Sequence, residues 1–104
     1  MTIQINTGKN LNGEDRRQVF FISKIAEALQ RFESHITRIE VHLKDVNGKK
    51  EGFNDILCVL EARLEGRQPI AITNQADTLE LAVTGAIDKI KSAIETILGK
   101  IQKH

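Results

Sequence analysis

The sequence contains few of the residues that build redox, metal and base-stacking sites. It has one cysteine, Cys58, one proline, and no tryptophan or tyrosine among its 104 residues. A single thiol cannot form an intramolecular disulfide or supply a multi-thiolate metal site, which indicates a reducing compartment. The shortage of aromatic residues also argues against an RNA-recognition motif, whose strands stack bases on aromatic rings.

Long apolar runs are also missing. No stretch approaches the roughly 18 apolar residues that a transmembrane helix requires. The opening MTIQINTGKN has neither the basic region nor the apolar region of a secretory signal. We therefore expect a cytoplasmic protein that does not contact a membrane. The length and the 40% hydrophobic content predict one compact domain, residues 1–104.

Charge of one sign is not in excess. Fifteen Lys and Arg oppose 14 Asp and Glu, which leaves a net charge of +1. Such a chain is not a bulk polycation, so any binding of nucleic acid requires cations gathered on one face.

Hydrophobic periodicity is the main signal that is present. Ile3 and Ile5 alternate with polar residues, and so do Ile39, Val41 and Leu43, which is typical of half-buried strands. Periods of three and four residues elsewhere indicate two amphipathic helices. The predicted elements in chain order are strand 2–6, helix 13–32, strand 36–44, strand 55–66, strand 68–74, and a helix from about 77 to about 99.

This order predicts the fold. A helix between the first two strands favours a right-handed crossover that joins parallel neighbours, and the short connections thereafter favour antiparallel pairing. Each helix has one apolar stripe and most strands have one apolar face, so the helices should cover one side of the sheet. We predict an α+β fold with a two-layer, dsRBD-like β-α-β-β-β-α arrangement, in which two helices pack on one face of a four-stranded sheet.

Several local features refine this prediction. Asn12 is placed to cap the first helix, and Asp77 with Glu80 is close to a capping box for the second. Cys58 falls on the apolar face of its strand, where a thiol behaves as a small hydrophobe. The predicted core stripes are Val19, Ile22, Ala26 and Leu29 of the first helix, and Leu79, Ala82, Val83, Ala86, Ile87, Ile90, Ile94, Ile97 and Ile101 of the second.

Catalytic and metal-binding patterns are absent from the sequence. His35, His42 and His104 lack the spacing of a metal site or a catalytic triad. Gly48 and Gly52 lie between two strands and lack the phosphate-loop pattern, so we expect an extended hairpin there. Its Lys49 and Lys50 could still contact a phosphate. We expect no enzymatic activity, no cofactor, no metal and no small-molecule substrate.

Cations recur on the predicted helices. Arg17, Lys24 and Arg31 are spaced by seven residues and form one stripe, almost opposite the predicted apolar stripe. Phe20 projects within about 40° of this stripe, either as an exposed ring that stacks on a base or as a rim-buried side chain. Such rows are often only solvated faces. The alternative is phosphate recognition, with these candidate RNA-binding residues: Lys9, Arg16, Arg17, Lys24, Arg31, Lys89, Lys91 and Lys100. We expect the cations of both helices to form one outward surface.

Three segments carry a resemblance to a known family. IQINTGKNL, RRQVFFISKIAEALQRF followed by ITRIEVHL, and above all ADTLELAVTGAIDKIKSAI resemble the ribosome hibernation-promoting factors, also called ribosome-associated inhibitors or sigma-54 modulation proteins. The segment RIEVHLKDVNGKKEGFNDILCVLEARLEG is similar to a divergent short branch of that family.

The resemblance implies the same β-α-β-β-β-α fold and a binding place on the small ribosomal subunit. Family members occupy the channel between head and body, contact ribosomal RNA, and occlude messenger and transfer RNA under stress or in stationary phase. By position, Lys24 and Arg31 match basic sites of the family's first helix, and Lys89 matches the lysine of its second-helix motif.

The sequence also departs from the family pattern. Glu80 replaces a common aromatic residue, and Ser92, Glu95 and Thr96 stand where further cations are usual. Because these cations are missing, we expect the second helix to bind RNA more weakly. We expect no C-terminal domain of the kind found in the long members, so pairing of ribosomes would need a separate partner.

The resulting hypothesis is a monomeric, ribosome-binding translation inhibitor, whose partners are the small ribosomal subunit and its RNA. The alternative is a protein-interaction or regulatory module of the same fold that does not bind ribosomes.

Overall fold

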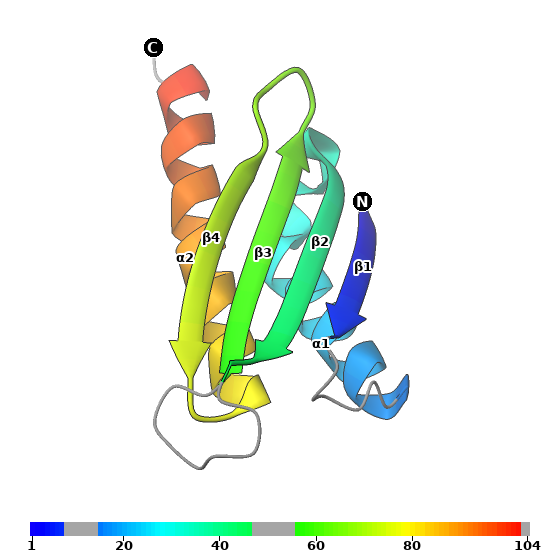
Figure 1. The fold of residues 1–104 in the computed structure, drawn as a ribbon. Coiled ribbons are helices and arrows are strands. Elements are labelled where there is room, and N and C mark those ends of the chain that lie inside the picture. The colour runs from blue at the N-terminus through cyan, green and yellow to red at the C-terminus, as the bar shows by residue number, and fades with distance from the viewer. Residues whose placement is uncertain (8–14, 47–55, 103–104) are drawn as a thin grey trace.

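The computed structural model describes residues 1–7, 15–46 and 56–102. For residues 15–17 and 100–102 it describes the backbone only. The elements in chain order are β1 (Thr2–Thr7), α1 (Asp15–Leu29), the 3₁₀ helix η1 (Gln30–His35), β2 (Ile36–Asp45), β3 (Ile56–Leu64), β4 (Ile70–Ala76) and α2 (Leu79–Gln102) (Figure 1). The predicted order of strands and helices is confirmed. The predicted cap Asn12 and the hairpin lysines Lys49 and Lys50 lie outside the described residues.

The sheet has the predicted topology. Its strand order is β1-β2-β3-β4, with β1 parallel to β2 and the other pairs antiparallel. Ile5 pairs with Val41, Val41 with Leu60, and Leu60 with Ile72, so apolar side chains form a row across all four strands. This register keeps one face of the sheet apolar.

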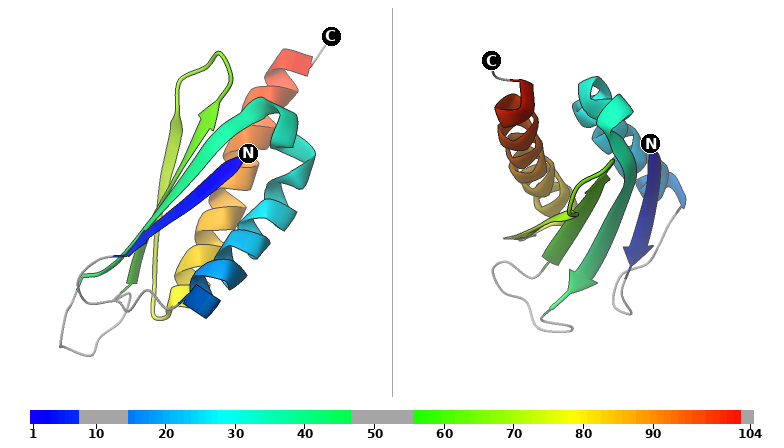
Figure 2. Two further views of the ribbon diagram at one scale, coloured as in Figure 1. Left: turned by 90° about the vertical axis from the view of Figure 1, so that its right-hand side faces the viewer. Right: turned by 90° about the horizontal axis from the view of Figure 1, so that it is seen from above.

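Both helices lie on that apolar face. They run side by side in the same direction, with α1 nearer β1 and β2 and α2 over β3 and β4 (Figures 1 and 2). Ile25 and Leu29 of α1, together with Ile90 and Ile94 of α2, are fully buried against the sheet. Within the described residues, no helix is long and apolar enough to cross a membrane.

The apolar stripe of α1 differs from the predicted one. Its core side is formed by Phe21, Ile25, Leu29 and Phe32, whereas Val19 is 61% exposed. The prediction was wrong because Leu29 belongs to two overlapping stripes. The stripe that is buried contains two phenylalanines, and its burial therefore removes more apolar surface from water than burial of the predicted stripe would.

This rotation changes where the cations of α1 lie. At about 100° per residue, Lys24 lies about 100° around α1 from the centre of the buried stripe, and not nearly opposite it. Lys24 of α1 and Arg31 of η1 both line cavities that include residues of α2, so they flank the core on the side of α2. The helix also ends earlier than predicted, because the chain tightens into η1 after Leu29, and Phe32 is buried from that 3₁₀ turn.

The start of α2 is capped by Thr78. The amide of Leu81 donates to Thr78 Oγ1 at 3.1 Å, and the amide of Ala82 donates to the Thr78 carbonyl at 2.9 Å. Thr78 thereby satisfies one of the free amides at the helix start. This cap directly follows Asp77, the residue at which the sequence predicted the helix start.

Asn74 of β4 fixes α2 against the sheet. Its Nδ2 donates to the carbonyls of Ala82 at 3.1 Å and Leu81 at 3.4 Å. Gly85 makes this approach possible, since a Cβ at that position would lie 2.2 Å from Asn74 Nδ2. The absence of a side chain at Gly85 therefore sets the distance between α2 and β4.

Candidate nucleic-acid interface

The groove between α1 and α2 collects the charged side chains of the helix layer. Two cavities lie along it. One, of about 330 Å³, is lined by Lys24, Glu27, Ala28, Thr84, Ile87 and Asp88. The second, of about 390 Å³, is lined by Arg31, Phe32, His35, Glu95, Leu98 and Gly99. A cation of α1, Lys24, and one of η1, Arg31, thus line the groove together with carboxylates of α2, Asp88 and Glu95.

Lys24 and Phe20 form one end of this groove. Lys24 Nζ lies 5.5 Å from the centroid of the Phe20 ring, which is a cation-π arrangement. Phe20 is 46% exposed, and its ring leans on Phe21 with centroids 5.6 Å apart. Phe20 therefore presents a half-exposed ring that packs against Phe21 and lies beside a cation. That arrangement is suitable for stacking on a base.

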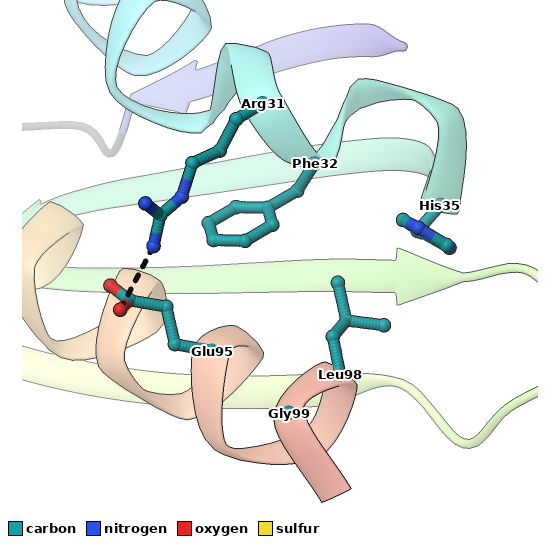
Figure 3. A pocket seen from close by; sticks show the side chains of 6 residues that line it. All are labelled: Arg31, Phe32, His35, Glu95, Leu98 and Gly99. Carbon is teal, nitrogen blue, oxygen red and sulfur yellow. Dashed lines mark ion pairs between the residues drawn. The ribbon is translucent and has the colours of Figure 1, made fainter. Parts of the chain in front are cut away.

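Arg31 forms the second end, as Figure 3 shows. Its Nη2 lies 2.9 Å from Glu95 Oε2, and its guanidinium lies 4.6 Å from the centroid of the Phe32 ring. Buried Phe32 and Leu98 form the apolar part of the cavity beneath the pair. The side chains of Arg31 and Glu95 are 59% and 44% exposed, so solvent reaches both charges.

The two described lysines of α2 lie on different sides of that helix. Lys89 Nζ donates to the carbonyl of Thr73 on the edge strand β4 at 2.9 Å, which turns this lysine away from α1. Lys91 is two residues later and so about 160° away around the helix. It is half-buried and lies one turn from Ile87 and Glu95, both of which line the groove.

The expected single surface of cations from both helices is therefore corrected. The structure brings Lys24 and Arg31 together on the groove, with Lys91 on the same side, but it places Lys89 against β4. Carboxylates are interspersed among the groove cations. Lys9 lies outside the described residues, and Arg16, Arg17 and Lys100 belong to helices but their side chains are outside the described part of the chain.

Other candidate chemistry is weak in the described part of the chain. Burial raises the pKa of the Cys58 thiol to about 12, which makes it a poor nucleophile at neutral pH. Asn6 Nδ2 lies 3.5 Å from Nδ1 of the exposed His42. Among the described residues, no group of three or more His, Cys, Asp or Glu side chains could hold a metal ion.

Comparison with known proteins identifies the family. Residues 4–102 match the family described as sigma 54 modulation protein / S30EA ribosomal protein. The chain belongs to this family. Membership confirms the resemblance drawn from the sequence, and it places the chain among ribosome-associated proteins.

Solved structures resemble this member of the S30EA family in fold. The N-terminal domain of Thermus thermophilus Protein Y is 16% identical, with a TM-score of 0.69, 92% of this chain covered and 94% of that chain. A ribosomal subunit interface protein from Coxiella burnetii is 15% identical, with a TM-score of 0.76, and the match covers 95% and 99% of the two chains. The comparison with curated protein sequences finds no match.

The acidic side of the groove in this S30EA-family protein was not predicted. The resemblance singled out Glu95 only as a departure from expected cations, and the aromatic support of Arg31 by Phe32 was not predicted. Phe32 and Leu98 carried a usable signal, because both continue apolar stripes at the same end of the two parallel helices.

Proposed function

We propose that the protein binds the small ribosomal subunit through its helix layer and inhibits translation by occluding the channel for messenger and transfer RNA. Family membership supports a ribosomal partner. The observation that carries the choice of surface is the placement of Lys24 on α1 and Arg31 on η1, seven residues apart, where the half-buried lysine and the exposed arginine both line cavities of the groove.

Recognition in this proposal is of RNA backbone and shape. Each phosphate that a Lys or Arg neutralises releases counterions, so a few contacts give binding that weakens steeply with salt. Phe20 supplies a ring for a base or sugar beside Lys24. The proposal assigns the chain no catalytic step, cofactor or metal, and places it in the cytoplasm as a stress or stationary-phase factor.

Charge reversal at Lys24 and Arg31 tests the surface. We expect the double variant Lys24→Glu/Arg31→Glu to lose at least tenfold in affinity for purified small subunits at moderate salt, because two attractive contacts become repulsive. Co-sedimentation across a salt series measures this loss. A matched control is Lys44→Glu/Arg67→Glu, which makes the same change in net charge at exposed positions of β2 and of the turn before β4.

The control should retain binding. Equal losses in both double variants would mean that only net charge matters, and unchanged binding in Lys24→Glu/Arg31→Glu would overturn the assigned surface. Occlusion has its own assay: the wild-type protein should compete with transfer RNA for small subunits. Simultaneous binding of both would contradict occlusion while leaving ribosome binding intact.

A module of the same fold that binds a protein and not the ribosome is the second candidate. It is favoured by the pairing of Arg31 with Glu95, which offsets one positive charge, and by the contact of Lys89 with Thr73, which turns that lysine away from the groove. Recovery of a defined protein partner, with no ribosomal RNA, in pull-downs from cells would favour this candidate.

A further inference from the structure

We propose that the ion pair with Glu95 neutralises Arg31 in the free protein. In the bound protein an RNA phosphate replaces this carboxylate, and the exchange sets the affinity and the salt dependence of binding. This inference rests on the proposed function and assigns to Glu95 the role of an affinity-limiting residue. The carboxylate belongs to the protein's own second helix, so the pair opens and closes without any other molecule.

The geometry makes Arg31 available once Glu95 is displaced. The guanidinium lies over the Phe32 ring at 4.6 Å, while the carboxylate reaches it from the neighbouring helix at 2.9 Å (Figure 3). Phe32 is buried and therefore fixed. Loss of the Glu95 contact leaves the guanidinium supported by the ring, and an approaching phosphate can take the place of the carboxylate.

The pair is weak enough to exchange. Both side chains are about half exposed, and exposed pairs of this kind contribute little net free energy because water solvates the separated charges well. A phosphate offers Arg31 a charge-assisted contact like the one that Glu95 makes, and its oxygens also fit the two-pronged guanidinium. Binding must nevertheless either break the existing pair or place the phosphate beside a like charge, and each lowers the affinity.

Lys24 provides an internal comparison. Its recorded partner is the Phe20 ring, and among the described residues it forms no ion pair. Lys24 can therefore meet a phosphate without giving up a carboxylate, whereas Arg31 cannot. Lys24 is thus available for a phosphate at all times, whereas Arg31 becomes available only when Glu95 is displaced.

Removing the Glu95 charge tests the exchange. We expect Glu95→Gln, which keeps the size of the side chain, to bind purified small subunits about three- to tenfold more tightly than the wild type. The slope of log affinity against log salt should steepen by roughly 0.7 to 0.9, the value of one added phosphate contact. In an Arg31→Gln background, the same Glu95→Gln change should alter affinity by less than about twofold.

The matched control is Glu61→Gln on the other face of the molecule. It also removes one carboxylate paired with an arginine, since Glu61 Oε1 lies 3.2 Å from Arg63 Nε. We expect less than a twofold change in affinity. A thermal midpoint close to that of the wild type shows that Glu95→Gln leaves the fold intact, as expected for an exposed pair.

The outcomes separate this inference from the proposed function. Wild-type affinity in Glu95→Gln, together with lost binding in Lys24→Glu, overturns the exchange and leaves ribosome binding standing. An equal gain from Glu95→Gln with and without Arg31 also overturns it, because a general charge effect would then suffice. Absence of ribosome binding by the wild type and all variants overturns both proposals.

Discussion

The charged side chains on the two outer faces of the molecule have different kinds of partner. On the open face of the sheet, Arg38 and Arg63 share Glu40 at 3.6 and 3.7 Å, and Arg63 also reaches Glu61 at 3.2 Å. Arg38 additionally donates to Gln4 of β1. On the helix layer, Arg31 has one carboxylate partner and Lys24 lies over a ring.

The difference indicates which cations serve the fold and which are offered to a partner. Glu40 has a side chain only 19% exposed, so its two arginines are bound into a network that spans β1, β2 and β3. The pair on the helix layer is more exposed at both ends. Interactions on the sheet face therefore stabilise neighbouring strands, whereas those of the groove can be exchanged at low cost.

Charge reversal of the two arginines on the sheet face should have the largest effect on the free energy of unfolding. Arg38→Glu/Arg63→Glu places two new carboxylates beside Glu40 and Glu61, and we expect a loss of about 2 to 3 kcal/mol in the free energy of unfolding. Denaturant unfolding measures it. Lys24→Glu/Arg31→Glu should lose less than about 1 kcal/mol, so equal losses in the two variants would contradict the division of roles.

Gly85→Ala should have the next largest effect. The new Cβ would meet Asn74 Nδ2 at 2.2 Å, so Asn74 must give up its contacts with Leu81 and Ala82 or α2 must shift. We expect a loss of about 1 to 2 kcal/mol and a fall of several degrees in the thermal midpoint.

A second substitution tests the cause of that loss. Asn74→Ala removes the clashing amide, so Gly85→Ala should cost less in that background than in the wild type. An identical cost in both backgrounds would place the strain elsewhere in α2.

Neutralising one carboxylate on each face should give the smallest difference in the free energy of unfolding. We expect Glu40→Gln to lower the free energy of unfolding by about 1 kcal/mol, because two arginines lose their shared partner. Glu95→Gln should lower it by less than about 0.5 kcal/mol. Thermal unfolding at low salt compares the two, and a larger loss for Glu95→Gln would show that the groove pair is structural.

The strand pattern was predictable because a strand has a simple period. The alternation of Ile56, Cys58, Leu60, Ala62 and Leu64 defined the buried face of β3 without knowledge of its neighbours. The same alternation places Glu40 and Glu61 on the opposite face of the sheet, where they pair with Arg38 and Arg63.

The helix layer was harder to predict because it depends on packing. Val19 and Phe21 begin alternative apolar stripes that meet at Leu29, and only the position of the sheet decides between them. The contact between Arg31 and Glu95 depends in turn on how far α1 and α2 are offset along their shared direction. Neither quantity is encoded in a local pattern, so the cations were identified but their surroundings were not.

Photo-crosslinking to bound small subunits tests most directly whether the helix layer, and not the sheet face, contacts RNA. A photoreactive residue is placed at Glu27, which lines the groove, or at His42, which is exposed on the sheet face. We predict crosslinks to ribosomal RNA from position 27 and none from position 42. Crosslinks from position 42 alone would contradict the account.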